Sequence, residues 1–320
     1  MNNKTLNKVL IAIAIPTAYA VAMRYIFGYE SWKEIFAVMS GTFLFLLPTI
    51  MGILTVYLLP QEKAKKVPYQ IFIPWIPIFL FLIITLMLNI EGWACWIMIL
   101  PIFLIAASVG GVIGGHLKVK KRNDRLNISV LILIPLLISP IENFIGSVQT
   151  NYKADTFIDI NAPAEKIWQN VTRVRAIPKS DDKGYLTSFL GFPRPVKAEL
   201  NFNGVGAHRE AIFTKGLVFH EDVIEYTANK KMVFTIKAFP YEIPSTTMDK
   251  HVVIGGDYFD VLNGTYEIEP LPNAKNRLHL YSIFKIRTTF NFYAGWWAKW
   301  IMKDIQNNIL QIEKTRSELP

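Results

Sequence analysis

Cysteine is almost absent from this sequence of 320 residues, because Cys95 is the only one. A chain with one cysteine forms no internal disulfide, so each folded domain must be held by its own core. Long apolar stretches are absent after residue 147, although five of them crowd the preceding part. These absences divide the chain into an apolar N-terminal region and a water-soluble domain of about 170 residues, which is enough for a core.

The five apolar stretches each approach the roughly 20 residues that a helix needs to cross about 30 Å of hydrocarbon. They cover residues 9–27, 35–59, 71–90, 93–115 and 128–145. Only Arg24 and Glu142 carry charge inside them. A cleavable signal peptide after Lys4 and Lys8 lacks a cleavage site, and buried helices of a soluble core would not repeat such long uncharged runs. We therefore predict an all-α transmembrane bundle of five helices over residues 1–148.

Basic residues in the short loops set the expected orientation, because loops rich in Lys and Arg stay in the cytoplasm. Loops 61–70 and 116–127 carry three and five such residues, whereas the first and third loops have no clear positive excess. The sequence thus predicts a multi-pass protein of the plasma (inner) membrane. Its N-terminus is expected in the cytoplasm, and residues 149–320 are expected to form an extracytoplasmic domain.

The net charge of +9 is mainly a consequence of this loop pattern. Residues 1–149 hold 12 basic and 6 acidic residues, whereas residues 150–320 hold 22 and 19. A nucleic-acid partner requires a strongly basic face on an accessible domain. The near-neutral soluble half disfavours that class of partner.

Four glycines of the fourth stretch form two overlapping small-xxx-small pairs, Gly110 with Gly114 and Gly111 with Gly115. Such pairs let a second helix approach closely. Packing within the chain is the favoured interpretation. A homo-oligomer formed through the Gly110/Gly114 helix is the alternative.

The soluble domain alternates in the way that strands do, with turn-like residues between the alternating runs. The expected strands cover residues 156–160, 197–202, 207–214, 217–226, 232–238, 257–269 and 277–288. A short helix is expected to begin at residues 161–165, with Pro163 in its first turn. A long closing helix is expected at 293–317, where Trp297 starts an apolar stripe.

The segment 158–168, with the sequence IDINAPAEKIW, resembles the opening strand and helix of the START-related, polyketide cyclase-like (SRPBCC) superfamily. The order of the later elements extends the resemblance over residues 151–318. It implies an α+β helix-grip domain, in which a seven-stranded curved antiparallel sheet surrounds a long C-terminal helix. It also implies an apolar cavity for lipids, sterols or polyketides, and it leaves the reaction open.

Motifs for chemistry are scarce in the soluble domain. Metal-ligand spacing, a phosphate-binding loop and a nucleophile elbow are all missing, so neither a metal nor a cofactor is expected. The five histidines are scattered along the chain, and His251 is placed at the cavity rim. Asp260 is the weak catalytic candidate. Unbroken alternation would put its carboxyl and Tyr258 in the cavity, whereas a bulge at Asn263-Gly264 would put Asp260 on the surface beside a lysine.

Two long loops and the start of the closing helix are suited to contact a lipid, because they are rich in aromatic or other apolar residues. We predict that residues 185–192 and the Trp296/Trp300 end of the helix face the bilayer as a gate, with Arg194 near the headgroups. The predicted ligand-binding residues are Phe189, Phe192, Arg194, His251, Tyr258, Tyr293, Trp297 and Ile301.

These observations favour binding over catalysis. The predicted function is a membrane-anchored carrier or sensor of a lipid or other hydrophobic small molecule, because a carrier needs only a cavity and a gate. The first alternative is a cyclase, hydrolase or isomerase that acts on a membrane-derived substrate. The second is a membrane assembly or scaffold protein.

Overall fold

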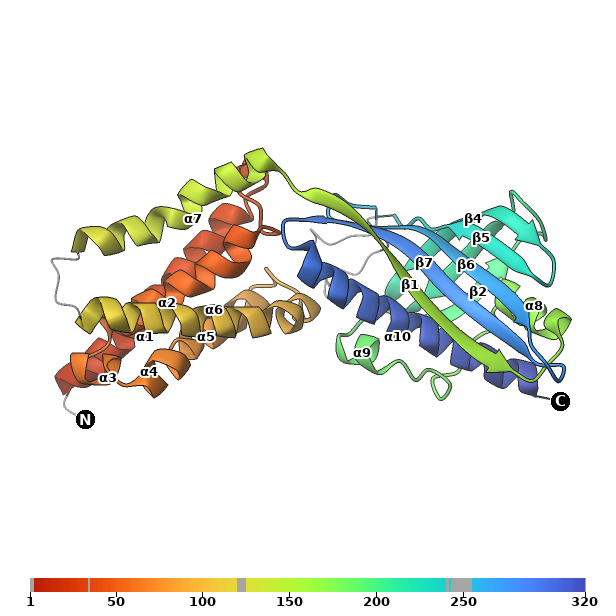
Figure 1. Ribbon diagram of the computed structural model, residues 1–320, viewed down its shortest axis with the longest axis horizontal. Coiled ribbons are helices and arrows are strands. Elements are labelled where there is room, and N and C mark those ends of the chain that lie inside the picture. The colour runs from red at the N-terminus through yellow and green to blue at the C-terminus, as the bar shows by residue number, and fades with distance from the viewer. Residues whose placement is uncertain (1–2, 34, 120–124, 240–241, 243–254, 320) are drawn as a thin grey trace. The chain divides into compact units, whose positions relative to one another are not determined.

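The computed structural model describes residues 3–33, 35–119, 125–239, 242 and 255–319. The chain divides into two compact units, which we call the helical unit (Met1–Ser147) and the sheet unit (Val148–Pro320) (Figure 1). Each unit has its own cluster of buried apolar side chains.

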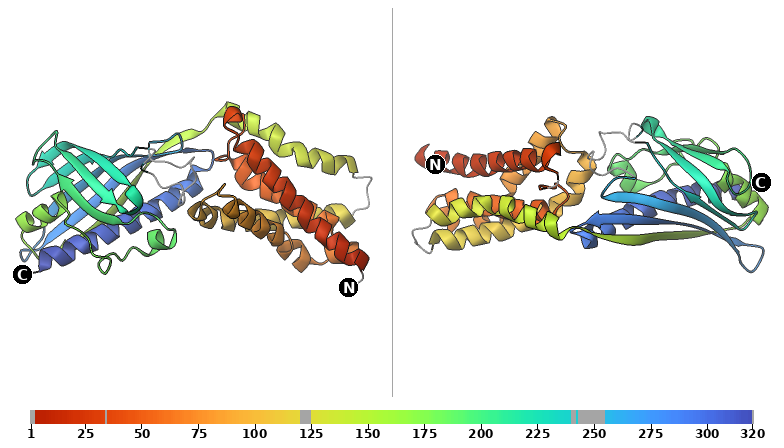
Figure 2. Two further views of the ribbon diagram at one scale, coloured as in Figure 1. Left: turned by 180° about the vertical axis from the view of Figure 1, so that it is seen from behind. Right: turned by 90° about the horizontal axis from the view of Figure 1, so that it is seen from above.

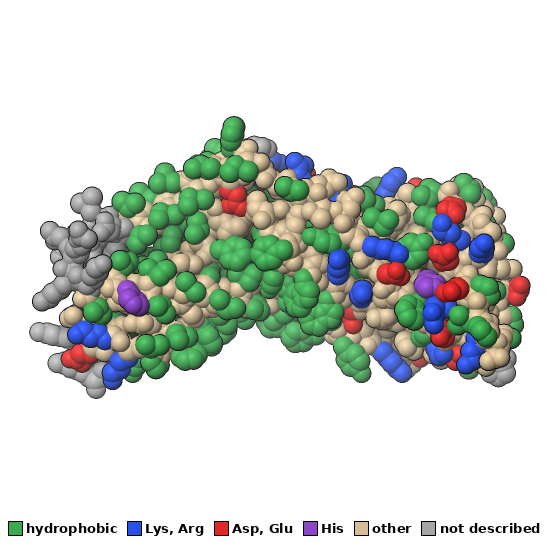
Figure 3. Space-filling model, in the orientation of Figure 1, with side chains coloured by type: hydrophobic (Ala, Val, Ile, Leu, Met, Phe, Trp, Pro, Cys, Tyr) green, Lys and Arg blue, Asp and Glu red, His purple; other side chains and the backbone are tan. Residues whose placement is uncertain are grey.

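The helical unit is built of α-helices and two short helical turns before the second helix. They are α1 (Asn3–Phe27), η1 (Glu30–Trp32), η2 (Thr42–Leu46), α2 (Leu47–Leu58), α3 (Gln61–Ala64), α4 (Val67–Phe72), α5 (Trp75–Met87), α6 (Trp93–Val119) and α7 (Arg125–Ile145). Hydrophobic side chains cover much of this unit's outer surface (Figure 3). The predicted all-α class of this region agrees with these elements.

Three helical segments are long and apolar enough to cross a membrane: Thr5–Phe27, Val67–Met87 and Trp93–Val119. The other two predicted stretches form the shorter apolar helices Thr42–Leu58 and Val130–Ile145. The predicted stretch 35–59 is therefore helical only from about residue 41. Glu142 explains this start, because its carboxylate accepts the backbone N–H groups of Gly41 at 2.7 Å and Thr42 at 2.9 Å. A carboxylate at these N–H groups stabilises the beginning of a helix.

Two further charged side chains of the helical unit also have partners at helix ends. Arg24, in the last turn of α1, pairs with Glu91, which precedes α6, and both side chains are buried. Lys118, in the last turn of α6, donates to the carbonyl oxygens of Tyr57 and Leu59 at the end of α2. The two contacts of Lys118 satisfy carbonyls that the end of α2 leaves without partners.

The glycines of α6 lie against other helices of the same chain. A side chain at Gly110 would overlap the carbonyl oxygen of Thr49, and one at Gly114 would approach Ile53 of α2. All four glycines of the two pairs are buried. A homo-oligomer formed through this helix stays a prediction, and it would need a surface other than these glycines.

The sheet unit is a seven-stranded antiparallel sheet with one long helix along one face (Figures 1 and 2). Its strands are β1 (Val148–Ile160), β2 (Pro195–Leu200), β3 (His208–Phe213), β4 (Val218–Thr227), β5 (Lys231–Thr235), β6 (Phe259–Pro270) and β7 (Asn276–Thr288). Its helices are α8 (Ala164–Thr172), α9 (Tyr185–Phe189) and α10 (Asn291–Glu318), with the turn η3 (Thr214–Gly216). The sheet order is β1-β7-β6-β5-β4-β3-β2. A meander that brings β1 beside β7 and holds the closing helix is the helix-grip arrangement that the resemblance implied.

The first strand is longer than expected. β1 begins at Val148 and pairs with β7 from Val148↔Thr288 to Ile160↔Asn276. Only Gly146 and Ser147 therefore separate α7 from the sheet, whereas the sequence analysis left residues 146–155 between the last apolar stretch and the first expected strand. The unit's buried cluster lies between the sheet and the helices α8 and α10, where Ile167, Trp168 and Leu310 pack against strand side chains. We call the face toward α10 the inner face and the opposite one the outer face.

Alternation along β7 follows the prediction. Leu278, Leu280, Ser282, Phe284 and Ile286 are buried on the inner face, and the residues between them are more exposed. The stripe on α10 is confirmed in the same way at its two ends, where Trp297 and Ile312 are buried.

Candidate functional site

The inner face of the sheet unit carries a buried ion pair. His208 to Glu210 on β3 alternate, so that Arg209 points inward while its neighbours point outward. Arg209 pairs with Glu221 of β4, and both side chains are almost fully buried. Its guanidinium also donates to the carbonyl oxygens of Val171 and Thr172, each at 3.3 Å, at the end of α8. Although burial opposes the charge, the Glu221 carboxylate raises the pKa of Arg209.

Glu313 brings a third buried charge-bearing side chain from α10 into the same interior. Its exposed fraction is 0%, and among the described residues neither carboxyl oxygen has a hydrogen-bond partner. Burial raises the pKa of Glu313 to about 7, although the positive charges of Arg316 and Arg209 oppose this rise. The carboxyl therefore exchanges its proton near neutral pH.

Tyr266 of β6 completes this interior polar group. Burial raises the pKa of its phenol, so the side chain remains a neutral donor. The Arg209 guanidinium lies 5.9 Å from the centre of its ring. We call Arg209, Glu221, Tyr266 and Glu313 the interior polar group. A partnerless carboxyl that feels the charge of a buried guanidinium can accept a hydrogen bond from a bound molecule, or give it a proton.

Sequence reasoning missed this group. The signal for Glu313 was present, because Glu313 follows Ile305 and Ile309 at intervals of four residues and so shares the apolar stripe of α10. Arg209 and Glu221 could have been found from the alternation of their two adjacent strands, which puts both side chains on the inner face. Charged residues at such places are seldom buried without a reason.

Asp260 is not part of the interior polar group. The register of β6 against β7 shifts between Val261 and Asn263, which is the bulge that the sequence allowed as an alternative. The bulge turns Val261 inward, where it is buried. It turns Asp260 outward, where its carboxylate pairs with Lys285 at 3.2 Å. Of the two arrangements that the sequence left open for Asp260, the structure has the one in which the carboxylate pairs with a lysine.

Arg194 has partners within the protein instead of projecting freely. Its guanidinium pairs with Asp182 and donates to the hydroxyl of Thr187. That hydroxyl and the Thr187 backbone N–H contact Asp304 of α10 at 2.6 and 2.9 Å. The hydrogen bond from Arg194 lowers the pKa of Asp182. Arg194 thus fastens the loop around α9 to α10, which differs from the predicted headgroup contact.

The other predicted ligand-binding residues have mixed surroundings. Trp297 is buried with an exposed fraction of 9%, whereas Phe189 is 61% exposed. The half-buried residues of the set are Phe192, Tyr258, Tyr293 and Ile301. His251 lies outside the described residues.

An exposed set of aromatic side chains lies on α9 and the first turns of α10. Phe292, Trp296 and Trp300 follow one another at intervals of four residues, so they share one face of α10. Tyr185 and Phe189 stand one turn apart on α9, which the contact between Thr187 and Asp304 holds against α10. All five are exposed, Tyr185 by 85%. We call these five residues the aromatic surface.

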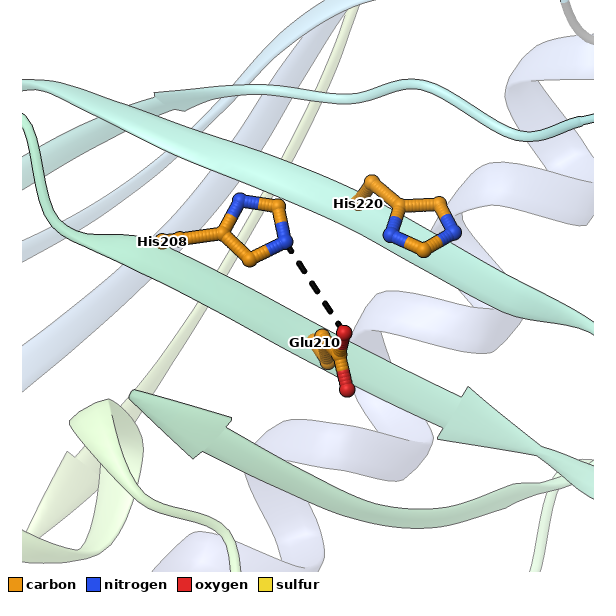
Figure 4. A group of neighbouring side chains, drawn as sticks. All are labelled: His208, Glu210 and His220. Atoms are coloured by element: carbon orange, nitrogen blue, oxygen red, sulfur yellow. Dashed lines mark ion pairs between the residues drawn. The ribbon is translucent and has the colours of Figure 1, made fainter. Parts of the chain in front are cut away.

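The outer face brings together residues that the sequence left scattered. His208, Glu210 and His220 each offer one ligand atom, and these atoms all lie within 4.8 Å of one another (Figure 4). The sequence predicted no metal, and this is the group of described residues that could hold a metal ion. The sequence hid it because the spacing of ligands was sought along the chain, whereas the pairing of β3 with β4 creates it across the sheet.

Comparisons with known proteins extend over about half of the chain. No family model and no curated protein matches the sequence. Among solved structures, a START superfamily protein from Mycobacterium smegmatis is 11% identical and covers 52% of this chain and 97% of its own, with a TM-score of 0.33. The Zhui aromatase/cyclase from a Streptomyces species is 12% identical, covers 53% and 94%, and has a TM-score of 0.34. Truncated norcoclaurine synthase from Thalictrum flavum is 14% identical, covers 55% and 98%, and has a TM-score of 0.31.

The class of the C-terminal domain is defined by its own topology. Seven antiparallel strands in the order found here, with β1 beside β7 and α10 on the inner face, give it the helix-grip fold. The function is argued from the residues of this chain.

Proposed function

We propose that this protein is a membrane-anchored binding protein for a hydrophobic small molecule that carries a hydrogen-bond donor. The observation that carries the proposal is Glu313, a fully buried carboxyl without a hydrogen-bond partner among the described residues. Leaving a buried polar group unpaired costs on the order of 1–3 kcal/mol. A hydroxyl, amide or ammonium group of a ligand would remove that cost, while its apolar part packs along the inner face.

The aromatic surface supports the access of such a ligand from a bilayer. Large exposed apolar patches on a protein mark sites that bind proteins, membranes or ligands. Trp and Tyr side chains also favour the headgroup zone of a membrane. Phe292, Trp296 and Trp300 lie on the helix that also carries Glu313. A molecule that enters beside these rings follows α10 inward to the interior polar group.

Anchoring by five crossings, with the sheet unit outside the cytoplasm, is part of the same proposal. Two contacts within the helical unit support the alternation of the helices. Arg24 pairs with Glu91, and these two residues belong to ends that five crossings put on one side of the membrane. Lys118 reaches Leu59, and these residues belong to ends on the other side. The Lys- and Arg-rich loops then indicate which of the two sides is the cytoplasm.

The topology is tested with a reporter that is active only in the cytoplasm. Fused after Pro320 it is expected to be silent, and fused within residues 118–125 it is expected to be active. The reverse pattern would overturn the proposed orientation.

The binding proposal is tested by native mass spectrometry of the full chain purified in detergent. The wild-type protein is expected to carry a co-purified molecule of defined mass. Glu313→Ala is expected to lose most of this occupancy, whereas Glu318→Ala, an exposed carboxyl on the same helix, serves as the matched control. Equal occupancy in both variants, or no bound mass in the wild type, would contradict the proposal.

Catalysis on a membrane-derived substrate is the second candidate, and the pKa of Glu313 favours it specifically. A carboxyl with a pKa of about 7 is suited to act as general acid or base near neutral pH. Such a cyclase, hydrolase or isomerase would keep the ligand in Glu313→Gln but stop converting it. Incubating the recovered molecule with each variant and comparing its mass and retention time separates the two functions.

A further inference from the structure

The hairpin of β3 and β4 carries a second polar group on the outer face, away from the interior polar group. The register pairs Glu210 directly with His220 and His208 with Asp222. Because alternate residues of a strand point to opposite faces, these four side chains share the face opposite Arg209 and Glu221. Cross-strand neighbours on one face have Cβ atoms about 4.5–5.5 Å apart, which is close enough for a shared ligand.

The hydrogen bonds around the two imidazoles leave one nitrogen of each ring for a ligand. Nδ1 of His208 lies 3.0 Å from the carboxylate of Asp222, so Nε2 faces Glu210, 3.9 Å away. Nε2 of His220 lies 3.2 Å from the carboxylate of Glu242, so Nδ1 is its remaining nitrogen. In Figure 4 both rings and the Glu210 carboxylate converge on one space.

This arrangement is the one that metal-binding histidines use. A ligating imidazole commonly places its second nitrogen on a carboxylate, which fixes the ring and makes the ligating nitrogen more basic. Here each of the two rings has such a carboxylate, Asp222 of β4 for His208 and Glu242 for His220. Two imidazoles and one carboxylate are a zinc-type ligand set with a fourth position left for water.

We propose that His208, Glu210 and His220 bind a divalent transition-metal ion of the zinc class. Ligand atoms around tetrahedral zinc lie about 3.3 Å apart, given bonds of about 2.0–2.1 Å. The three atoms here lie within 4.8 Å of one another. Rotations of the side chains that bring these atoms closer by up to about 1.5 Å would therefore complete the tetrahedral spacing. The side chains are 40%, 46% and 21% exposed in the order His208, Glu210 and His220, which leaves an open route for the ion.

Bound metal would tie three parts of the sheet unit together. It would join β3 to β4 and, through His220, also hold Glu242. The same two strands carry Arg209 and Glu221 on the inner face. The site is independent of the proposed ligand function, because its residues face away from Glu313.

The test measures zinc binding to the tag-free full chain in detergent, by isothermal titration and by metal analysis after dialysis. One Zn²⁺ per chain and a rise in melting temperature are expected, with no such effect of Mg²⁺, which avoids imidazole ligands. His208→Ala and His220→Ala are each expected to weaken binding by about 100-fold or more. Asp222→Asn is expected to weaken it by about 10–100-fold, the usual cost of losing a carboxylate behind a ligating imidazole.

His279→Ala is the matched control, because His279 also pairs with a carboxylate, Glu269 at 3.0 Å, on the outer face. Its zinc affinity is expected to equal that of the wild type. His208→Gln is added in case the alanine variant folds poorly, and melting without zinc checks the fold of each variant. No saturable zinc binding, or equal binding by folded His208 and His220 variants, would overturn the site.

Discussion

The two units treat buried charge differently. In the helical unit, Arg24 has Glu91, and Glu142 has the N–H groups that begin η2. In the sheet unit, Arg209 has Glu221, but Glu313 is buried without a hydrogen-bond partner among the described residues. Charged side chains thus have partners even in the apolar helical unit. The exception is therefore informative, because native proteins break local rules mainly where a function requires it.

The largest effect is expected at the satisfied pair. Arg209→Met leaves the Glu221 carboxylate buried without its partner, which costs about 3–5 kcal/mol of unfolding free energy. Thermal unfolding of the purified protein, followed by near-ultraviolet circular dichroism, measures the loss.

Arg277→Met is the matched control for that loss, because Arg277 pairs with Asp159 at the surface, 2.7 Å away. Its expected cost is much smaller, because water screens an ion pair at the surface. Equal losses in the two variants would mean that burial does not distinguish these pairs.

The next largest effect is expected at Glu313, where substitution should raise the free energy of unfolding instead of lowering it. The pKa of Glu313 rises from 4.5 to about 7 on folding, so unfolding releases a proton between these pH values and stability falls as pH rises through them. Glu313→Gln stays neutral, so its stability relative to the wild type is expected to grow across this interval. The gain should reach on the order of 3 kcal/mol above pH 7 in delipidated protein. A difference that stays constant with pH would contradict the partnerless state of this carboxyl.

A smaller effect is expected at the glycines of the helical unit. Gly110→Ala places a methyl group against the carbonyl oxygen of Thr49, so α2 and α6 must separate. Overpacking of this kind costs about 1–3 kcal/mol. Ile113→Ala, on an exposed part of α6, is the control. Melting in detergent compares them, and equal stability of both variants would show that α2 does not pack on Gly110.

The smallest effect is expected at Asp260. Its pair with Lys285 is partly exposed, so Asp260→Asn should cost less than about 1 kcal/mol and leave ligand occupancy unchanged. Melting and native mass spectrometry on one preparation measure both. Loss of occupancy would return Asp260 to the site.

The sequence predicted elements better than it predicted contacts. Alternation of large apolar residues on β7 and the stripe on α10 are local periodic signals, and both were readable. The bulge at Val261 was readable only as an alternative, because a register shift depends on the partner strand. The pairing of Glu210 with His220 depends on how a hairpin folds back, so no spacing along the chain reveals it.

The site was less predictable than the fold for a related reason. Arg194 was read as free for a lipid headgroup, since its sequence neighbours are apolar, yet Asp182 and Thr187 occupy it. Glu313 was overlooked because glutamate is normally exposed on helices. Both errors come from treating charged residues as solvent-seeking when tertiary contacts decide their surroundings.

The pairing of β1 with β7 also sets the order of events during synthesis. Val148 follows the apolar helix α7 after only two residues, yet its partner is Thr288, 140 positions later in the chain. At roughly 5–20 residues per second, the ribosome needs on the order of ten seconds to make the intervening chain. Throughout that time β1 lacks the one strand that it pairs with in the sheet. The sheet can close only after β7 has been made, which leaves an unpaired strand edge as a place for a chaperone to bind.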